Sequence, residues 1–310
     1  MQQRKFSQYL IISLKGIAMG AADVVPGVSG GTIAFISGIY EELLSSISSI
    51  NITNLKLLKN QGVKAAWKAI NGNFFVALLS GIFISIISLA KLISWLLENK
   101  AIMVWSFFFG LVLASVLHVG KQLTKWNITT IILLIIGAFF AYFITTLQPA
   151  ISESSSLLFY FFAGSLAICA MILPGISGSF ILVLLGAYKP VLDAIHNRDI
   201  QLLGVVAFGA VVGILSFSKV LRWLFNHHKD YTLAVLTGFM LGSLNKIWPW
   251  KETITWRINS HGVKIPFNEQ SVSPFSYEGD AQLVMAIILL ISGFLVIMLL
   301  EKLANTSKKM

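Results

Sequence analysis

The sequence has few charged residues and almost no cysteine. Only 12% of its 310 residues are charged, whereas 56% are hydrophobic, and the mean hydropathy is +0.81. A water-soluble globular domain does not tolerate this balance, so the predicted surroundings of most of the chain are lipid. The one cysteine, Cys169, excludes an intrachain disulfide and leaves the redox compartment open.

Several functional motifs are absent as well. The sequence has no HExxH motif, no P-loop, no Ser/His/Asp spacing and no clustered His and Arg of the kind a membrane phosphatase uses. The five His residues are scattered without metal-ligand spacing. We therefore expect no enzyme, no metal and no other cofactor. The net charge of +10 does not form the basic stripe of a nucleic-acid-binding fold, so no nucleic-acid partner is expected.

Long apolar runs are the main feature that is present. A helix needs about 20 apolar residues to cross a bilayer. Six such runs predict membrane-crossing helices over residues 73–97, 101–119, 128–148, 200–221, 231–247 and 281–300. Two further apolar regions, 9–47 and 157–195, are interrupted in the middle by Pro and Gly, which predicts a broken hairpin in each.

An internal repeat relates the two halves of the chain. The segment VVPGVSGGTIAFISGIYEELLSSI, residues 24–47, matches ILPGISGSFILVLLGAYKPVLDAI, residues 172–195, at an offset of 148. A second block matches at an offset of 128: Gly81, Lys91, Trp95, Gly110 and Ser115 recur as Gly209, Lys219, Trp223, Gly238 and Ser243. The predicted fold class is thus an all-α integral membrane protein whose single membrane domain contains a first repeat, 1–150, and a second repeat, 151–310.

Charge distribution predicts how the repeats are oriented. If each hairpin is re-entrant, each repeat has three crossings, and this odd number gives the two repeats opposite orientations. With both termini cytoplasmic, the cytoplasmic segments hold thirteen basic residues and the opposite side seven, as the positive-inside rule requires. Hairpins that cross fully would give ten helices with the same sidedness, so the charge count leaves both alternatives open.

The interrupted hairpins predict an anion site. Broken helices in inverted repeats mark the substrate site of many secondary transporters, and helix N-termini attract phosphate. The predicted hairpin breaks are Pro26, Gly27, Pro174 and Gly175. Beyond each break, a serine is a natural N-cap of the second arm. The predicted phosphate-binding residues are Ser29, Gly30, Gly31 and Thr32 in the first motif and Ser177, Gly178 and Ser179 in the second.

Charged residues near these motifs are further candidates. Lys91 and Lys219 either supply positive charge to an anionic head group or extend from helix ends to the membrane interface. Asp23 either binds a coupling H⁺ or Na⁺, pairs with Lys15, or faces a wet cavity without a role. Glu41 is a weaker candidate for the same coupling or charge-pair role, because a solvated hairpin end is the simpler interpretation.

The run KGIAMGAADVVPGVSGGTIAFISGIYE, from Lys15 to Glu41, resembles the N-terminal signature of the polyprenyl-phosphate transporter family. The ILPGISGS segment and the repeated Gly, Lys and Trp positions fit the same family. The resemblance implies a flippase in the bacterial inner (cytoplasmic) membrane. Its activity would return undecaprenyl phosphate from the outer to the inner leaflet for reuse in peptidoglycan and other cell-envelope synthesis. The alternative is a carrier for a small soluble anion. The oligomeric state is not predicted.

One long polar segment, 247–280, separates the last two predicted crossings. It contains Trp248, Trp250 and Trp256 and lies outside in the predicted topology. These tryptophans either rest on the outer leaflet surface and guide lipid entry, or belong to a plain connecting loop.

Overall fold

The structure is a computed structural model that describes residues 4–25, 27–150, 156–258 and 264–307. Its first half contains α1 (Phe6–Val24), α2 (Gly30–Ile36), α3 (Tyr40–Ser48), α4 (Ile52–Ala69), α5 (Gly72–Asn99), α6 (Ala101–Gly120) and α7 (Ile128–Thr146). Its second half contains α8 (Leu157–Ile172), α9 (Gly178–Leu184), α10 (Tyr188–Asn197), α11 (Ile200–His227), α12 (Lys229–Ser243), the 3₁₀ turn η1 (Leu244–Ile247), β1 (Lys251–Ile258), β2 (Lys264–Ser271) and α13 (Leu283–Ser307).

The order of helices repeats between the halves. Helices α2 and α9 begin 148 positions apart, at Gly30 and Gly178, and helices α5 and α11 begin 128 positions apart, at Gly72 and Ile200. Both offsets are those of the sequence repeat. The extra residues of the first half form α4, which has no counterpart in the second half and changes direction at Gly62, where φ is 81°.

Four of the six predicted crossings are helices long and apolar enough to span a bilayer, namely α5, α6, α7 and α11. The other two are the shorter α12, with 15 residues, and α13, whose apolar part is Leu283–Leu299. Helix α12 is largely enclosed by protein, which explains why it can be short and contain threonines at positions 232 and 237. In the hairpin regions the chain forms three helices each, and α9 and α10 meet at a bend of 105°.

Helices from the two halves pack against one another in matching pairs. Helix α1 runs along α5 as α8 runs along α11. Across the halves, α6 packs on α13 and α12 packs on α7. The repeated glycines permit this contact: a Cβ at Gly81 would collide with the carbonyl of Ser13, and one at Gly209 with the carbonyl of Phe161. Small residues of this kind let helix backbones approach closely in membranes.

The all-α prediction is wrong for one segment. Residues 251–271 contain an antiparallel β-hairpin in which Thr253 lies opposite Glu269, and residues 259–263 at its tip are outside the described part of the chain. Its first strand, KETITWRI, is rich in the β-branched and aromatic residues that favour strands. The polar segment therefore contains regular secondary structure and is not an irregular loop.

Two of the three tryptophans of that segment face the protein. The Trp250 indole donates to the carbonyl of Ala281 at 2.9 Å and is 6% exposed, and the Trp248 indole donates to the carbonyl of Val272 at 2.8 Å. Only Trp256 is half exposed. For the buried Trp250, the prediction of a position on the leaflet surface is therefore wrong, whereas Trp248 is half-buried beside it.

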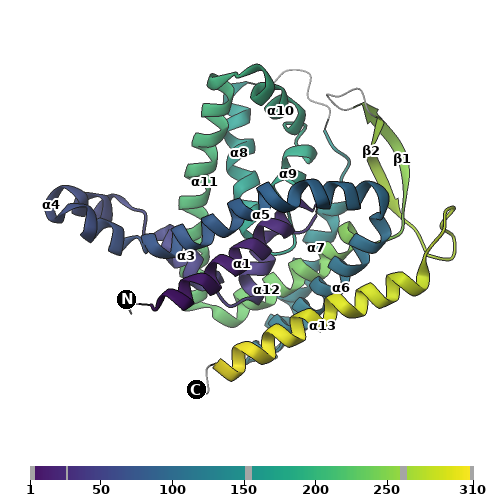
Figure 1. The fold of residues 1–310 in the computed structure, drawn as a ribbon, viewed down its shortest axis with the longest axis horizontal. Helices are drawn as coiled ribbons and strands as arrows, with labels where there is room; N and C mark the ends of the chain where they lie inside the picture. The colour runs from purple at the N-terminus through teal and green to yellow at the C-terminus, as the bar shows by residue number, and fades with distance from the viewer. Residues whose placement is uncertain (1–3, 26, 151–155, 259–263, 308–310) are drawn as a thin grey trace.

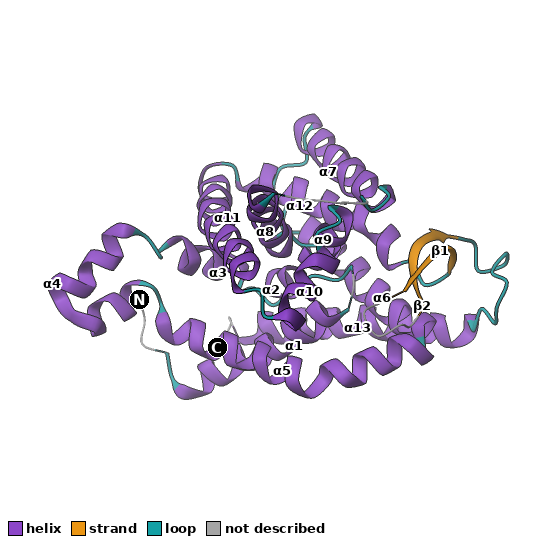
Figure 2. Cartoon of the chain, turned by 90° about the horizontal axis from the view of Figure 1, so that it is seen from above, coloured by secondary structure: helices purple, strands orange, loops and turns teal. Residues whose placement is uncertain are grey.

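Figures 1 and 2 show α4 and the β-hairpin at opposite ends of the longest axis of the molecule. The start of α1 and the end of α13 both lie toward the α4 end in the two views. Helix α4 carries four exposed lysines, Lys56, Lys59, Lys64 and Lys68. One end of the molecule therefore combines the start of α1 and the end of α13 with a strongly basic helix.

Candidate functional site

 The two Pro-Gly motifs, 148 residues apart in the sequence, meet in space. The hydroxyl of Ser29 donates to the carbonyls of Met171 and Leu173, at 2.9 and 3.2 Å. The backbone N–H of Gly175 donates to Thr32 Oγ1 at 3.0 Å. Three hydrogen bonds thus join the first motif directly to the second.

The local backbone of the two motifs is the same. Gly27 and Gly175 have φ values of +83° and +100°, in the left-handed region that glycine adopts most readily. Two residues further on, Ser29 accepts from the N–H of Gly31 at 3.0 Å and Ser177 accepts from the N–H of Phe180 at 3.2 Å. The predicted N-cap roles of Ser29 and Ser177 are confirmed. Residue 26 lies outside the described residues, so the predicted break at Pro26 is not described, whereas Pro174 directly precedes the turn at Gly175.

Asp23 already binds the start of α2. Its Oδ1 atom accepts from the N–H of Gly30 at 2.7 Å, and a Cβ at Gly30 would lie 2.5 Å from Oδ2. A carboxylate at this position complements the partial positive charge of a helix start. The predicted anion position in the first motif is therefore occupied by an anion that the chain itself supplies.

Lys15 binds the opposite end of the same helix. Its Nζ atom donates to the carbonyl of Ser37, the C-cap residue of α2, at 2.5 Å. Lys15 and Asp23 therefore do not form an ion pair with each other. The structure places the predicted cation and acid at the two ends of α2, which agrees with the dipole of that helix.

The two motifs differ in exposure. Every residue of α2 is buried, including the predicted phosphate-binding residues Gly30, Gly31 and Thr32, whereas α9 has no buried residue. A Cβ at Gly31 would collide with the carbonyl of Ile172. In the second motif, Ser177 is buried, Gly178 is half-buried and Ser179 is exposed. In this conformation the first motif is closed, and the second motif is partly exposed.

The remaining predicted site residues lie elsewhere. Lys91 and Lys219 are exposed side chains of α5 and α11, and no hydrogen bond between described residues joins either of them to a motif. Glu41 forms an ion pair with Lys229 of the second half at 2.7 Å, with both side chains more than half exposed. Of the roles considered for Glu41, the structure shows the charge pair.

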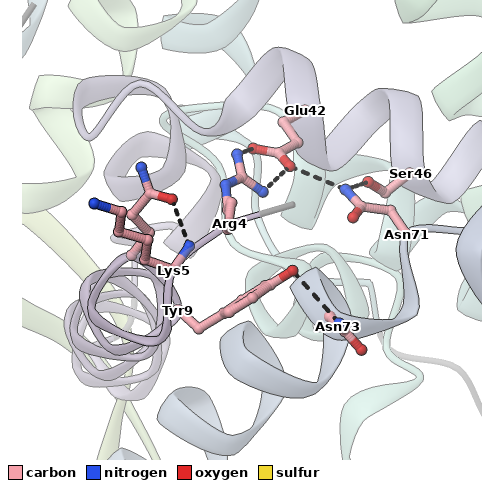
Figure 3. A network of polar contacts seen from close by, with 8 residues as sticks. Arg4, Lys5, Tyr9, Glu42, Ser46, Asn71 and Asn73 are labelled. Atoms are coloured by element: carbon pink, nitrogen blue, oxygen red, sulfur yellow. Dashed lines mark hydrogen bonds and ion pairs between the residues drawn. The ribbon is translucent and has the colours of Figure 1, made fainter. Parts of the chain in front are cut away.

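A polar network fixes the far end of the first hairpin (Figure 3). Arg4 donates to both carboxylate oxygens of Glu42, at 2.6 and 2.7 Å. Asn71 donates to Glu42 at 2.9 Å and to Ser46 at 3.1 Å. Since Asn71 directly precedes α5, the network joins the chain start, α3 and the beginning of α5.

One residue near both motifs was not among the sequence-based candidates. Lys246, in η1, has its Cγ atom 2.8 Å from the position a Cβ on Gly27 would take, and its Nζ atom lies 4.7 Å from the centroid of the Phe180 ring. The internal repeat could have indicated Lys246, because at the offset of 128 it aligns with another basic residue, His118.

The model of the VCA0040-like family, described as undecaprenyl phosphate translocase-like, matches residues 19–265, a range that contains both motifs and strand β1. The chain belongs to this family. The resemblance predicted from Lys15–Glu41 is thereby confirmed. Family membership, together with the apolar helices α5, α6, α7 and α11, makes the chain a multi-pass membrane protein.

Two curated relatives cover nearly all of the chain. A polyprenyl-phosphate transporter of Vibrio cholerae is 50% identical over 305 residues, which cover 97% of this chain and 99% of the relative. A polyprenyl-phosphate transporter of Staphylococcus aureus is 34% identical over 278 residues, which cover 84% of this chain and 92% of the relative. Both are named as transporters and not as enzymes, as expected for this chain. No solved structure is significantly similar to it.

Proposed function

We propose that the chain transports a polyprenyl phosphate across the bilayer. The substrate we infer is undecaprenyl phosphate, moved as by a flippase from the outer to the inner leaflet of the bacterial cytoplasmic membrane for reuse in envelope synthesis. Family membership and two relatives named polyprenyl-phosphate transporters support the substrate class. The exposed apolar side chains of α5, α7 and α11 support it as well, because an isoprenoid tail can stay in lipid beside them.

A single observation carries the proposal: Asp23 binds the N–H of Gly30 where the two motifs touch. Backbone N–H groups at a helix start bind carboxylate and phosphate in the same way. The phosphate would replace the Asp23 carboxylate on Gly30 in one stage of transport. Ser29, Gly31 and Thr32 would complete the first half of this site, and Ser177, Gly178 and Ser179 the second half.

The transport cycle we propose is alternating access. The first motif is buried and the second is partly exposed, so the opposite state would expose the first and bury the second. The change requires the hydrogen bonds from Ser29 to Met171 and Leu173, and from Gly175 to Thr32, to break. Two halves of opposite orientation would give the two states related geometries, as in other inverted-repeat transporters.

Coupling to an ion gradient is assigned to Asp23. A proton or Na⁺ on its carboxylate would weaken the charge-assisted bond to Gly30 and free that N–H for phosphate. Lys15 would stay at the other end of α2 and keep that helix in place. The ion gradient would then act on Asp23, the residue that competes with the substrate phosphate for the N–H of Gly30.

The orientation we propose places both chain ends in the cytoplasm. The basic helix α4 lies toward the same end as the start of α1 and the end of α13, and the β-hairpin lies at the other end (Figures 1 and 2). Lysines concentrate on the cytoplasmic side of membrane proteins. The β-hairpin would thus face the outer side, from which the substrate enters.

The test is leaflet-resolved movement of labelled undecaprenyl phosphate in proteoliposomes, with a small phosphate ester as competitor. We expect protein-dependent movement that survives the competitor and fails in Ser179→Leu, which fills the exposed edge of the second motif. Ser216→Leu is the matched control, because Ser216 is an exposed serine of α11 outside the motifs. Movement of the soluble ester without the lipid would contradict the proposal and make the chain an anion carrier.

A further inference from the structure

Lys246 occupies a place that no other cation of the described chain shares. It lies in η1, directly after α12, and its side chain extends from the Gly27 turn of the first motif to the Phe180 ring of the second. The next residue, Ile247, also lies against Gly27, at 3.4 Å from the position of a Cβ there. Further back, Met240 and Ser243 lie against Gly175. The end of α12 therefore packs on both Pro-Gly turns, and Lys246 brings a positive charge to this contact.

No carboxylate among the described residues forms an ion pair with Lys246. Its close contact is the face of Phe180, which attracts a cation with only about 0.5–2 kcal/mol. A second lysine lies beside it: Lys251 Nζ donates to the Lys246 carbonyl at 2.6 Å and lies 4.4 Å from the Trp105 ring centroid. Glu269 attracts both cations from beyond ion-pair distance, and their close contacts are aromatic rings. Two neighbouring cations without a direct ion pair favour an anionic ligand.

The equivalent position of the first half lies next to an acidic residue. His118, which aligns with Lys246, lies 3.2 Å from a carboxylate oxygen of Glu301. The two halves therefore differ in the ion pairing of this basic residue, as their motifs differ in exposure. Among the described residues, Lys246 in the second half forms no direct ion pair, whereas His118 in the first half lies beside a carboxylate.

We propose that Lys246 is a ligand of the substrate phosphate. The ammonium group would leave the Phe180 ring for the phosphate monoester of the polyprenyl lipid, since a charge-assisted hydrogen bond is the stronger interaction. Exposed Ser179 directly precedes Phe180 in α9, and its hydroxyl lies 3.4 Å from that of Ser177. Lys251, through its bond to the Lys246 carbonyl, acts as a positioning residue. The inference rests on the proposed transport of a polyprenyl phosphate and assigns its head group a cation.

The experiment measures binding of undecaprenyl phosphate, and of undecaprenol as the phosphate-free probe, to the purified full chain in nanodiscs. Loss of a hydrogen bond to a charged group costs about 1.5–3 kcal/mol, so Lys246→Gln should weaken binding of the phosphate lipid about 10- to 100-fold. Binding of undecaprenol should not change. Lys246→Arg should restore most of the affinity, because it keeps the charge. Lys189→Gln, which removes an exposed lysine of α10, should behave as wild type.

The outcomes separate the two proposals. If the wild type binds undecaprenyl phosphate and Lys246→Gln binds it equally well, the role of Lys246 is overturned and the transport proposal stands. If the wild type does not bind the phosphate lipid, both fall. If the Lys246→Gln variant does not fold, a labelling measurement on the wild type tests the same proposal. Undecaprenyl phosphate should protect Lys246, but not Lys189, from amine acetylation read by peptide mass spectrometry, and equal labelling of Lys246 with and without the lipid would overturn the inference.

Discussion

Asp23 and Lys15 bind the two ends of one short buried helix, α2. Asp23 accepts from Gly30 at its start, and Lys15 donates to Ser37 at its end. The seven residues between these contacts form a helix about 10 Å long, so the two charges are too far apart to neutralise each other directly. They are instead connected through the dipole of α2, and a change at one end alters the electrostatics of the whole helix.

Asp23→Asn tests the coupling role. The amide oxygen can still accept from Gly30, so lipid binding should stay within about threefold of wild type, while uptake should no longer respond to an imposed gradient of H⁺ or Na⁺. The measurement is undecaprenyl phosphate uptake in proteoliposomes with and without each gradient. Glu98→Gln, at an exposed position of α5, is the control. Gradient-driven transport at the wild-type rate by Asp23→Asn would refute the coupling role.

Lys15→Met tests the electrostatic support of α2. The substitution keeps the length of the side chain but removes the charge and the hydrogen bond to Ser37, so we expect a loss of about 1–2 kcal/mol in stability. The thermal unfolding midpoint of the purified protein should fall by several degrees. Lys189→Met removes a lysine that is 66% exposed and should leave the midpoint nearly unchanged. Equal midpoints for the two variants would show that Lys15 does not stabilise α2.

Gly31→Ala tests the contact between the motifs. A methyl group at this position would collide with the carbonyl of Ile172, and overpacking of this kind costs about 1–3 kcal/mol. The closed state of the first motif should be disfavoured and transport should fall steeply. Gly204→Ala is a matched control, because a Cβ at Gly204 in α11 meets no atom within 4 Å and alanine favours a helix. Normal transport by Gly31→Ala would mean that the close approach is not required.

Lys251 gives a pH dependence of stability. It lies in β1, outside the membrane-spanning helices, and burial lowers its pKa from 10.5 to about 8, against the attraction of Glu269. The unfolded chain therefore holds this proton more tightly, and stability should rise as the pH increases from about 8 to about 10.5. Thermal unfolding across this range should show the increase in wild type and a smaller one in Lys251→Met. An identical increase in both proteins would assign the effect to another group.

Local sequence signals predicted the repeated part of the fold well. The Pro-Gly-x-Ser-Gly pattern located two turns with left-handed glycines at Gly27 and Gly175, and the N-caps Ser29 and Ser177 follow from the same few residues. Long apolar runs located α5, α6, α7 and α11. These features depend on neighbours in sequence, which is why a single chain reveals them.

Features that depend on distant contacts escaped prediction. Helix α12 can be short because it packs between α6 and α7. The sequence of residues 231–247 alone does not predict these contacts. The β-hairpin gains its order from Trp248 and Trp250, which bind carbonyls more than 20 residues away. Lys246 became a candidate only because the end of α12 packs on both turns. Asp23 and Gly30 were both candidates, but the hydrogen bond between them was not predicted, because it requires α1 and α2 to fold back on each other.

The unequal burial of α2 and α9 bears on inhibition. If α2 and α9 exchange their buried and exposed environments during the cycle, a small molecule bound to the exposed side of α9 would keep α2 buried without contacting it. Such a compound would need to match only the surface of Ser179 and its neighbours, which differs from the first copy because Gly31 stands at the position of Ser179. A pair of similar motifs therefore offers a selective target, since one copy is accessible while the other is hidden.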